Sequence, residues 1–302
     1  MIIDGHIHTF TAARGVRLGE ELITSERYGK VRRQGRGLER WMPPSFENSN
    51  FPVEMLVEYL DWAGVEKGIL LQSTVYGDHN EYYSEIIKRY PGRFAGFALV
   101  DPRGGERSLD RLEYVVKKLG LIGPKIEVPD IPIDLRESSY KPFWQKVVDL
   151  DAFLGIDLGW EPESSYYFQL EQLRLILQSY PNLKLLLTHT GLGGRSFSTL
   201  AEDTLNNILE LTKTGNNTMF DLAGFPLLCN DEEYPFPSAQ KIVGKICEKV
   251  GSERIIWGSD IPQILKKCTY KQCLRWIKDC DYLTERDKKR ILGENAEEFY
   301  RL

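Results

Sequence analysis

The sequence predicts a (β/α)8 TIM barrel with a long insertion after its first strand, and two observations lead to this prediction. The first is a series of eight apolar, strand-like runs, which after the second run are spaced by roughly 30 residues, the length of one βα unit. An open doubly wound sheet is the alternative, but no Gly-x-Gly-x-x-Gly motif or P-loop follows any run. The runs begin near Ile2, Gly68, Phe94, Leu121, Ala152, Leu183, Thr218 and Arg254.

The second observation is the helix-like stretches that separate these runs. Their apolar residues recur at three- and four-residue spacing, which places them on one face of a helix. Eight strands that alternate with helices close most simply into a barrel of about 250 residues plus insertions. The clearest stretches are residues 53–63, 109–119, 143–150, 170–177 and 200–211.

The interval between the first two strands is about twice one βα unit. Its excess, residues 11–50, leaves the barrel at the carboxyl end of the first strand, the face where such barrels carry out their chemistry. We expect these residues to form an inserted loop over that face, acting as a lid or binding loop; a solvated or oligomer-contact insertion is the alternative. No linker or low-complexity tract divides the chain, so residues 1–302 are predicted to form a single domain.

Composition excludes several classes of protein. The 44 acidic and 39 basic residues leave a net charge of −5, which gives no electrostatic footprint for nucleic acid. No apolar run approaches the ~18 residues that a membrane span needs, and Asp4 and His6 interrupt the amino terminus too early for a signal peptide. The five cysteines are odd in number and form no Cys-x-x-Cys, so we expect neither a disulfide framework nor a zinc ribbon. A cytoplasmic protein is predicted, with a homodimer as a candidate assembly.

Two histidines, His6 and His8, follow the first strand-like run. Side chains at i and i+2 of a strand point the same way, so these imidazoles are expected to lie side by side and to form one edge of a metal site. His189 follows the sixth run and Asp260 the eighth. A backbone-bonded core histidine and a helix-capping aspartate are the alternatives. Because all strand ends of a barrel meet at one face, we expect the four residues to share a site.

With these residues in place, the chain resembles the amidohydrolase-related (amidohydrolase 2 type) branch of the metal-dependent hydrolases, which includes decarboxylases of aromatic and muconate-type acids. The resemblance implies a (β/α)8 barrel with one divalent metal, usually zinc. It implies His6 and His8 as ligands, Asp260 as a ligand or proton shuttle, and His189 as an acid/base residue or carbonyl polariser. The markers are residues 4–8 (Asp-Gly-His-Ile-His), 90–94, 101–102, 188–191, 257–260 and 293–296.

The chain departs from this family after the fifth strand. The family usually has a metal-binding histidine there, whereas this chain has Asp157. Aspartate ligates zinc through oxygen and shifts metal preference toward harder ions, so we expect Asp157 to join the metal site, with zinc as the ion and manganese as the alternative. Loss of the metal is the opposite interpretation, because metal-free lactone hydrolases of this family retain His-x-His.

Five further residues are candidates for substrate binding: Arg103, Lys125, Arg195, Tyr76 and Trp160. The arginines could clamp an anionic substrate through paired hydrogen bonds, and Lys125 could bind a carboxylate. Each cation also has an ordinary explanation as a solvated or salt-bridged residue. The resemblance also raises a carbamylated Lys125 that bridges two metals, as in binuclear relatives, but those relatives normally use histidines after both the fifth and the sixth strands, and only His189 is present here.

Three functions follow from this interpretation. The first is a hydrolase that activates water with its metal and acts on a small, carboxylated substrate, with Asp260 and His189 as the catalytic residues. The second is a metal-dependent decarboxylase of the same fold. The third is a catalytically inactive barrel that binds a ligand, for which Asp157 is the only support.

Overall fold

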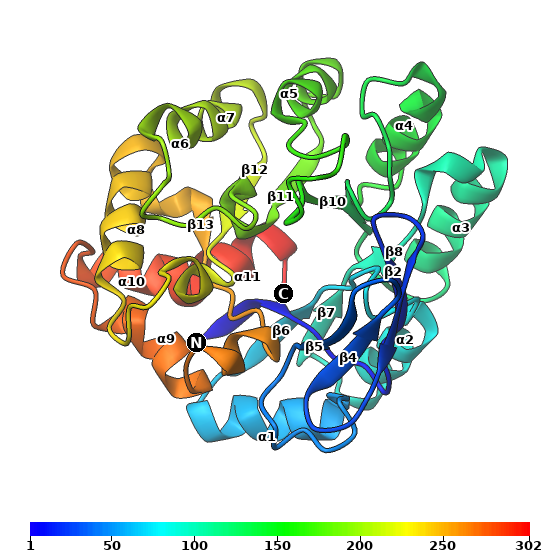
Figure 1. The fold of residues 1–302 in the computed structure, drawn as a ribbon. Helices are drawn as coiled ribbons and strands as arrows, with labels where there is room; N and C mark the ends of the chain where they lie inside the picture. The colour runs from blue at the N-terminus through cyan, green and yellow to red at the C-terminus, as the bar shows by residue number, and fades with distance from the viewer.

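The computed structural model describes residues 1–302, and its centre is a closed barrel of parallel strands (Figure 1). Neighbouring strands pair in chain order, and the third strand is interrupted at Phe97, so that β7 pairs with β6 and β8 with β9. The barrel closes where Gly5 N donates to Trp257 O at 2.8 Å and Asp260 N to His6 O at 2.9 Å. The strands are β1 (Ile3–Ile7), β6 (Lys67–Leu70), β7 (Phe94–Gly96), β8 (Ala98–Leu99), β9 (Pro124–Glu127), β10 (Phe153–Asp157), β11 (Lys184–Leu187), β12 (Thr218–Asp221) and β13 (Ile255–Ile256).

The predicted barrel is therefore confirmed. The fourth strand differs most from its expected start, since it begins at Pro124 rather than near Leu121. Pro124 lies at the first position of β9, where a strand tolerates the missing backbone N–H best.

Helices surround the barrel and cover its outer surface. Their buried faces follow the helical period: α9 buries Tyr270, Cys273, Leu274 and Ile277, and Thr269 with Gln272 forms a capping box at its start. None of the helices combines the length and the apolar character that crossing a bilayer requires. The helices are α1 (Val53–Ala63), α2 (Asn80–Arg89), α3 (Glu106–Lys117), α4 (Lys141–Asp149), α5 (Leu170–Ser179), α6 (Glu202–Leu209), α7 (Leu211–Thr214), α8 (Pro237–Val250), α9 (Tyr270–Lys278), α10 (Glu285–Lys289) and α11 (Asn295–Tyr300).

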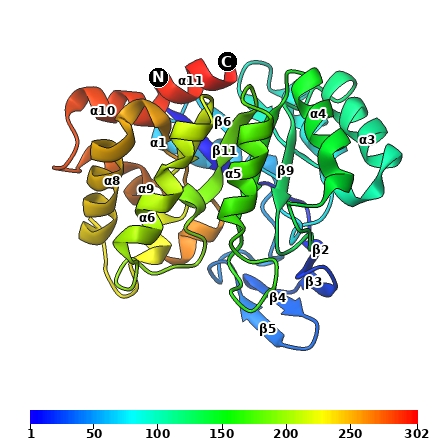
Figure 2. The same cartoon turned by 90° about the horizontal axis from the view of Figure 1, so that it is seen from above.

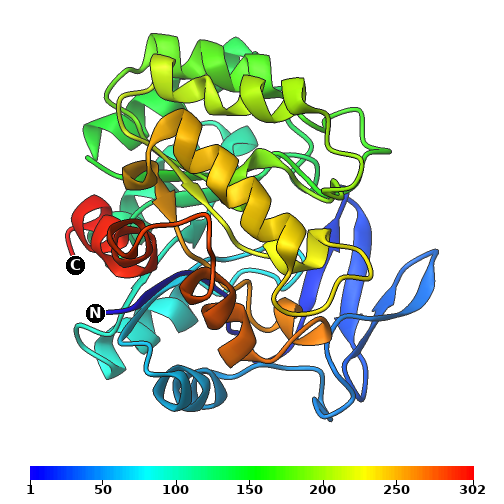
Figure 3. The ribbon, with the colours of Figure 1, turned by 90° about the vertical axis from the view of Figure 1, so that its left-hand side faces the viewer.

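Two apolar cores stabilise this arrangement. The larger lies between the strands and the surrounding helices, and the smaller fills the inside of the barrel. Phe97, Phe153 and Leu186 point into the smaller core, and Ala296 and Tyr300 of α11 close it. Figures 2 and 3 show that α11 lies at one end of the barrel and the inserted segment at the other. A site can therefore form at the end opposite α11, between the strand ends and the inserted segment.

The inserted segment is a folded sheet, which corrects the expectation of a loop over residues 11–50. Four antiparallel strands pair in sequence order, β2 (Arg14–Arg17), β3 (Glu21–Ser25), β4 (Lys30–Arg33) and β5 (Gly37–Arg40). Each pair is joined by a short connection, so that the sheet needs few long-range contacts to form.

Backbone hydrogen bonds fix this sheet to the barrel. Arg14 N donates to Tyr76 O at 3.1 Å and Val16 N to Thr74 O at 3.0 Å. The approach is so close that a Cβ on Gly15 would lie 1.9 Å from the Thr74 carbonyl oxygen, which explains glycine at this position. The inserted sheet is thus an extension of the barrel wall.

Candidate active site

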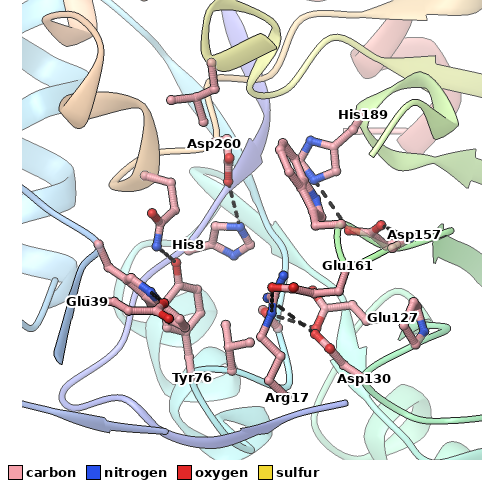
Figure 4. Close-up of a pocket in the computed structure, with 18 of the residues that line it drawn as sticks. His8, Arg17, Glu39, Tyr76, Glu127, Asp130, Asp157, Glu161, His189 and Asp260 are labelled. Carbon is pink, nitrogen blue, oxygen red and sulfur yellow. Dashed lines mark hydrogen bonds and ion pairs between the residues drawn. The ribbon is translucent and has the colours of Figure 1, made fainter. Parts of the chain in front are cut away.

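A cavity of about 210 Å³ opens at the carboxyl ends of the barrel strands, beneath the inserted sheet (Figure 4). Side chains from several strand ends converge on it, which is where barrels of this class place catalytic groups. The residues predicted from sequence that line this cavity are His8, Tyr76, Lys125, Asp157, Trp160, His189 and Asp260. The inserted sheet and the residues after it add Arg17, Arg33, Glu39 and Trp41.

The first strand holds its two histidines in defined tautomers. His6 Nδ1 lies 2.9 Å from Asp221 Oδ2, and His8 Nδ1 lies 2.6 Å from the carbonyl oxygen of Leu71. Both partners are acceptors, so each Nδ1 carries the proton and each Nε2 keeps a lone pair. Burial keeps the pKa of His6 well below its ordinary value, which also favours the neutral ring.

The two lone pairs meet a carboxylate. His6 Nε2 and His8 Nε2 are 3.2 Å apart, and Asp260 Oδ1 lies 3.1 Å from His8 Nε2. With the proton of each ring on Nδ1, these three atoms present lone pairs to one another, an arrangement that a cation would stabilise. Two nitrogen ligands of a tetrahedral zinc ion at ~2.0–2.1 Å lie about 3.3 Å apart, close to the observed spacing. His6, His8 and Asp260 therefore fit a divalent metal.

His189 lies on the other side of His6, with ring centroids 4.8 Å apart. Its Nδ1 lies 2.9 Å from Ala223 O, and its Nε2 is 3.6 Å from Asp157 Oδ2. Burial opposes a charge on this ring, but the carboxylates of Asp157, Asp260 and Asp221 outweigh burial and raise the pKa of His189. His189 is thus a donor that faces the cavity.

Asp157 faces His189 and lies outside the tightest groups of potential ligands. Two such groups have ligand atoms within 4.8 Å of one another: His6 with His8 and Asp260, and His6 with His189 and Asp221. Asp157 uses its Oδ1 to accept a hydrogen bond from Gly159 N at 2.7 Å. Its other oxygen, directed toward His189, is the one free to act in the site.

The backbone at these positions is unusual. His189, Thr190 and Asp260 all have positive φ angles, of 53°, 52° and 63°. Residues with a Cβ rarely adopt this left-handed conformation, and where they do it is often at functional sites. Asp260 nevertheless has a structural support, since its backbone N–H bonds to His6 O and links the eighth strand to the first.

Lys125 forms a buried ion pair rather than a free ammonium. Its Nζ lies 2.6 Å from Glu127 Oε1, and Glu127 also accepts hydrogen bonds from Ser73 and Thr74. Burial opposes ionisation of Glu127, yet Lys125 and these donors lower its pKa to about 2. The carboxylate therefore stays charged at the cavity wall.

Two predicted substrate-binding residues do not line the cavity. Arg103 is exposed and folds back onto Asp101, with its Nη2 2.7 Å from Asp101 Oδ2. The Arg195 guanidinium stacks over Phe168 at 4.0 Å and donates to Leu192 O at 2.9 Å. A position just after a strand does not fix where a long side chain points, because the loop that carries it can turn outward.

Asp221 and Asp4 are the supporting residues that sequence reasoning missed. Asp221 binds His6 and accepts the backbone N–H of His189 at 2.6 Å. It ends the apolar run Thr218–Asp221, so it carries the same signal as His189 and Asp260. Asp4 accepts hydrogen bonds from Ser259 N at 2.9 Å and the Tyr270 hydroxyl at 2.8 Å, and burial raises its pKa to about 7.

The inserted sheet contributes a network of charges that sequence did not predict in detail. Arg17 Nε lies 2.8 Å from Glu161 Oε1, and Arg33 Nη1 lies 3.3 Å from the same oxygen. Arg17 also faces Asp130 at 3.7 Å. These pairs link the inserted sheet to the loops after β9 and β10 at the cavity (Figure 4).

Histidines after the first and sixth strands, with an aspartate after the eighth, define the class of barrel hydrolases and lyases that work with a metal at the strand ends. A family model described as Amidohydrolase, of the amidohydrolase 2 type, matches residues 3–302. The chain belongs to this amidohydrolase family, as its sequence predicted.

Individual relatives include both hydrolases and decarboxylases. A gamma-resorcylate decarboxylase from Polaromonas sp. strain JS666 is 25% identical over 255 residues, which cover 74% of this chain and 75% of that one. A probable 2-pyrone-4,6-dicarboxylic acid hydrolase from Acinetobacter baumannii, crystallised with citric acid, has a TM-score of 0.71 at 21% identity and covers 100% of this chain and 99% of its own. A dihydroxybenzoic acid decarboxylase from Polaromonas sp. JS666, with bound manganese and 2-nitroresorcinol, has a TM-score of 0.58 at 18% identity, covering 82% and 86%. These structural likenesses show the fold.

Proposed function

We propose that the protein is a metal-dependent hydrolase of a small, carboxylated substrate, in which His6, His8 and Asp260 hold one divalent ion. The observation that carries this proposal is the convergence of two unprotonated Nε2 atoms and Asp260 Oδ1 at one cavity. Zinc is the expected ion and manganese the alternative, since two nitrogens and one carboxylate suit both. When bound, the ion would polarise a substrate carbonyl and acidify water.

Asp260 is the proposed proton acceptor. Its Oδ1 faces His8, whereas its Oδ2 accepts no hydrogen bond from the protein. Burial opposes its charge, but the adjacent rings of His8 and His189 lower the pKa of Asp260. A carboxylate with a lowered pKa and one free oxygen suits a group that takes a proton from water and passes it to the leaving group.

His189 is the proposed stabiliser of negative charge on the substrate. Its Nδ1 is engaged with the Ala223 carbonyl, which leaves Nε2 as the atom that faces Asp157 and the cavity. A protonated Nε2 there can donate to an oxygen as negative charge develops on it. Asp157 would hold His189 in its cationic form, a role for this aspartate that does not need a bond to the metal.

Decarboxylation is the second candidate, and His189 also supports it. A decarboxylase must deliver a proton to carbon, and a histidine held cationic by Asp157, Asp260 and Asp221 is a suitable donor. The gamma-resorcylate decarboxylase relative points the same way. Hydrolysis is preferred because Asp260 provides an ionised acceptor with a free oxygen, which decarboxylation does not need.

The test separates hydrolysis, decarboxylation and inactivity. Purified protein loaded with zinc or manganese would be incubated with carboxylated lactones and with dihydroxybenzoates, while carbon dioxide release and uptake of ¹⁸O from labelled water are measured. The proposal expects ¹⁸O in the product and no carbon dioxide. Carbon dioxide release without ¹⁸O uptake would establish the decarboxylase instead, and turnover of neither class in the metal-loaded protein would favour a ligand-binding barrel.

A further inference from the structure

Four cations line the cavity, and three of them are already paired with carboxylates. Lys125 is bound to Glu127, Arg17 to Glu161 and Asp130, and Arg33 to Glu21 and Glu161. The fourth cation is Lys266. The residue is exposed, its Nζ forms no hydrogen bond or ion pair with the protein, and Asp260 and Glu39 act on it only as more distant charges. Lys266 is therefore the cation at this cavity that remains available to a ligand.

The position of Lys266 follows from a short 3₁₀ turn, Gln263–Lys266, which begins three residues after Asp260. In a 3₁₀ helix the side chains at i and i+3 eclipse, so Lys266 projects from the same side of the turn as Gln263. Both residues line the cavity. The turn thus presents one amide and one ammonium to the same space.

Tyr76 adds a second donor to this wall. Gln263 Nε2 donates to the Tyr76 hydroxyl oxygen at 2.9 Å, so the proton of the hydroxyl is not used in that bond. A phenol is protonated at neutral pH, since its ordinary pKa is about 10, so this proton is free to bond to an acceptor in the cavity. The Tyr76 ring stacks on Phe10 at 4.1 Å and lies 5.2 Å from His8, so it is fixed beside the proposed metal ligands.

The cavity can bind an anion even though its lining carries more carboxylates than cations. Six carboxylates line it against four cations, yet most of those carboxylates are engaged with arginine, lysine or histidine. The free donors on this wall are the Lys266 ammonium and the Tyr76 hydroxyl proton. A ligand that matches them presents an acceptor with negative charge.

We propose that Lys266, assisted by the Tyr76 hydroxyl, binds a carboxylate of the substrate that does not take part in the reaction, and so selects substrates that carry this additional anionic group. This inference rests on the proposed function in one respect, namely that the bound ligand is the substrate. The site itself is defined by binding and does not depend on which reaction follows. The sequence predicted that Arg103 and Arg195 would bind the substrate carboxylate. We assign this role to Lys266, which lies on the loop after the eighth strand.

The experiment measures the binding of three small probes to the metal-loaded full-length protein by isothermal titration calorimetry. The probes are isophthalate, 3-carbamoylbenzoate and isophthalamide, which share one ring and carry two, one and no carboxylates. Wild-type protein is expected to bind isophthalate most tightly. Lys266→Met should weaken isophthalate binding by about 10- to 100-fold, the range for loss of a hydrogen bond between charged groups, while isophthalamide binding changes little. Lys266→Arg should restore most of the affinity.

Lys267→Met is the matched control. Lys267 follows in sequence and bonds to the Asn230 carbonyl, and it does not line the cavity. The variant removes the same charge and should leave isophthalate binding unchanged. Three results would overturn the inference. They are an equal loss of isophthalate affinity in both variants, unchanged affinity in a folded Lys266→Met protein, and a wild-type protein that does not bind isophthalate. If Lys266→Met alone loses isophthalate affinity but the wild-type protein turns over no substrate, the binding site is upheld and the proposed function is rejected.

Discussion

Replacing Asp221 with asparagine should change the tautomer of His6 without removing any atom that lines the cavity. Asp221 Oδ1 accepts the backbone N–H groups of His189 and Ala223, at 2.6 and 3.1 Å, and Oδ2 faces His6 Nδ1 at 2.9 Å. An amide has only one oxygen. If that oxygen stays with the two backbone donors, the new NH₂ group opposes the Nδ1–H of His6.

The expected loss of metal affinity follows from these two donors facing each other. Two facing donors in a fully buried site cost about 1–3 kcal/mol, which the ring avoids by moving its proton to Nε2. The proton then lies between His8 and Asp260, where the lone pair of His6 is needed for a metal. Loss of such a supporting hydrogen bond typically lowers metal affinity by about 10- to 100-fold, or about 1.4–2.8 kcal/mol. We expect a loss in this range for Asp221→Asn.

Competition against a chelator of known affinity would measure the metal dissociation constant, and long-range ¹⁵N–¹H NMR would report the tautomer of His6. Asp130→Asn is the control, because Asp130 also lines the cavity but pairs with Arg17 and the backbone of Leu18. A folded Asp221→Asn protein that binds metal as tightly as Asp130→Asn, with His6 still protonated on Nδ1, would refute the reasoning.

Further variants test other parts of the structure. Asp260→Asn should lower kcat by at least about 100-fold with the fold retained, because the proton acceptor is lost, and steady-state kinetics would contradict the role if most turnover survived. Lys125→Met should lower the free energy of unfolding by about 3–5 kcal/mol at pH 7, as measured by urea denaturation, because it leaves Glu127 charged and buried. The pKa of Glu127 is lowered to about 2, so the stability that its charge contributes is complete above about pH 4.5 and is lost as the pH falls toward 2. The difference in unfolding free energy between wild type and Lys125→Met should therefore shrink over this pH range. A difference that stays constant with pH would contradict the role of this ion pair. Gly15→Ala should detach the inserted sheet, because its methyl group would lie 1.9 Å from Thr74 O, and unchanged protease resistance of the sheet would argue otherwise.

The barrel was predictable because its signals are local and repeated. Runs of apolar residues mark strands that are buried on both faces, and three- and four-residue spacing marks the helices, so α1 and α5 begin at the predicted residues. The inserted sheet was not predicted because its strands are short and rich in arginine, carry few buried residues in no clear alternation, and β5 has none. Its Gly19, Gly29 and Gly35, which have positive φ angles between the strands, were the available signal.

The candidate site was most predictable where a residue ends or directly follows a strand, although Tyr76 and Trp160 on longer connections were also predicted and line the cavity. The backbone of a closed barrel fixes the positions at the strand ends, and it brings His6, His8, His189 and Asp260 together. Residues on longer connections follow the path of their loops, which depends on tertiary contacts. Arg103 therefore turns back to Asp101, whereas Lys266 returns to the cavity through a 3₁₀ turn.

The left-handed backbone at His189, Thr190 and Asp260 also has a consequence for protein engineering. Each such residue costs of order 1–3 kcal/mol, and glycine or asparagine would relieve part of that cost. A selection for thermostability alone is therefore expected to favour glycine or asparagine at His189 and Asp260. Heat-resistant variants that arise in this way would have lower backbone strain but would lack the side chains proposed for catalysis. A stability screen of this protein should therefore be paired with an activity screen from its first round.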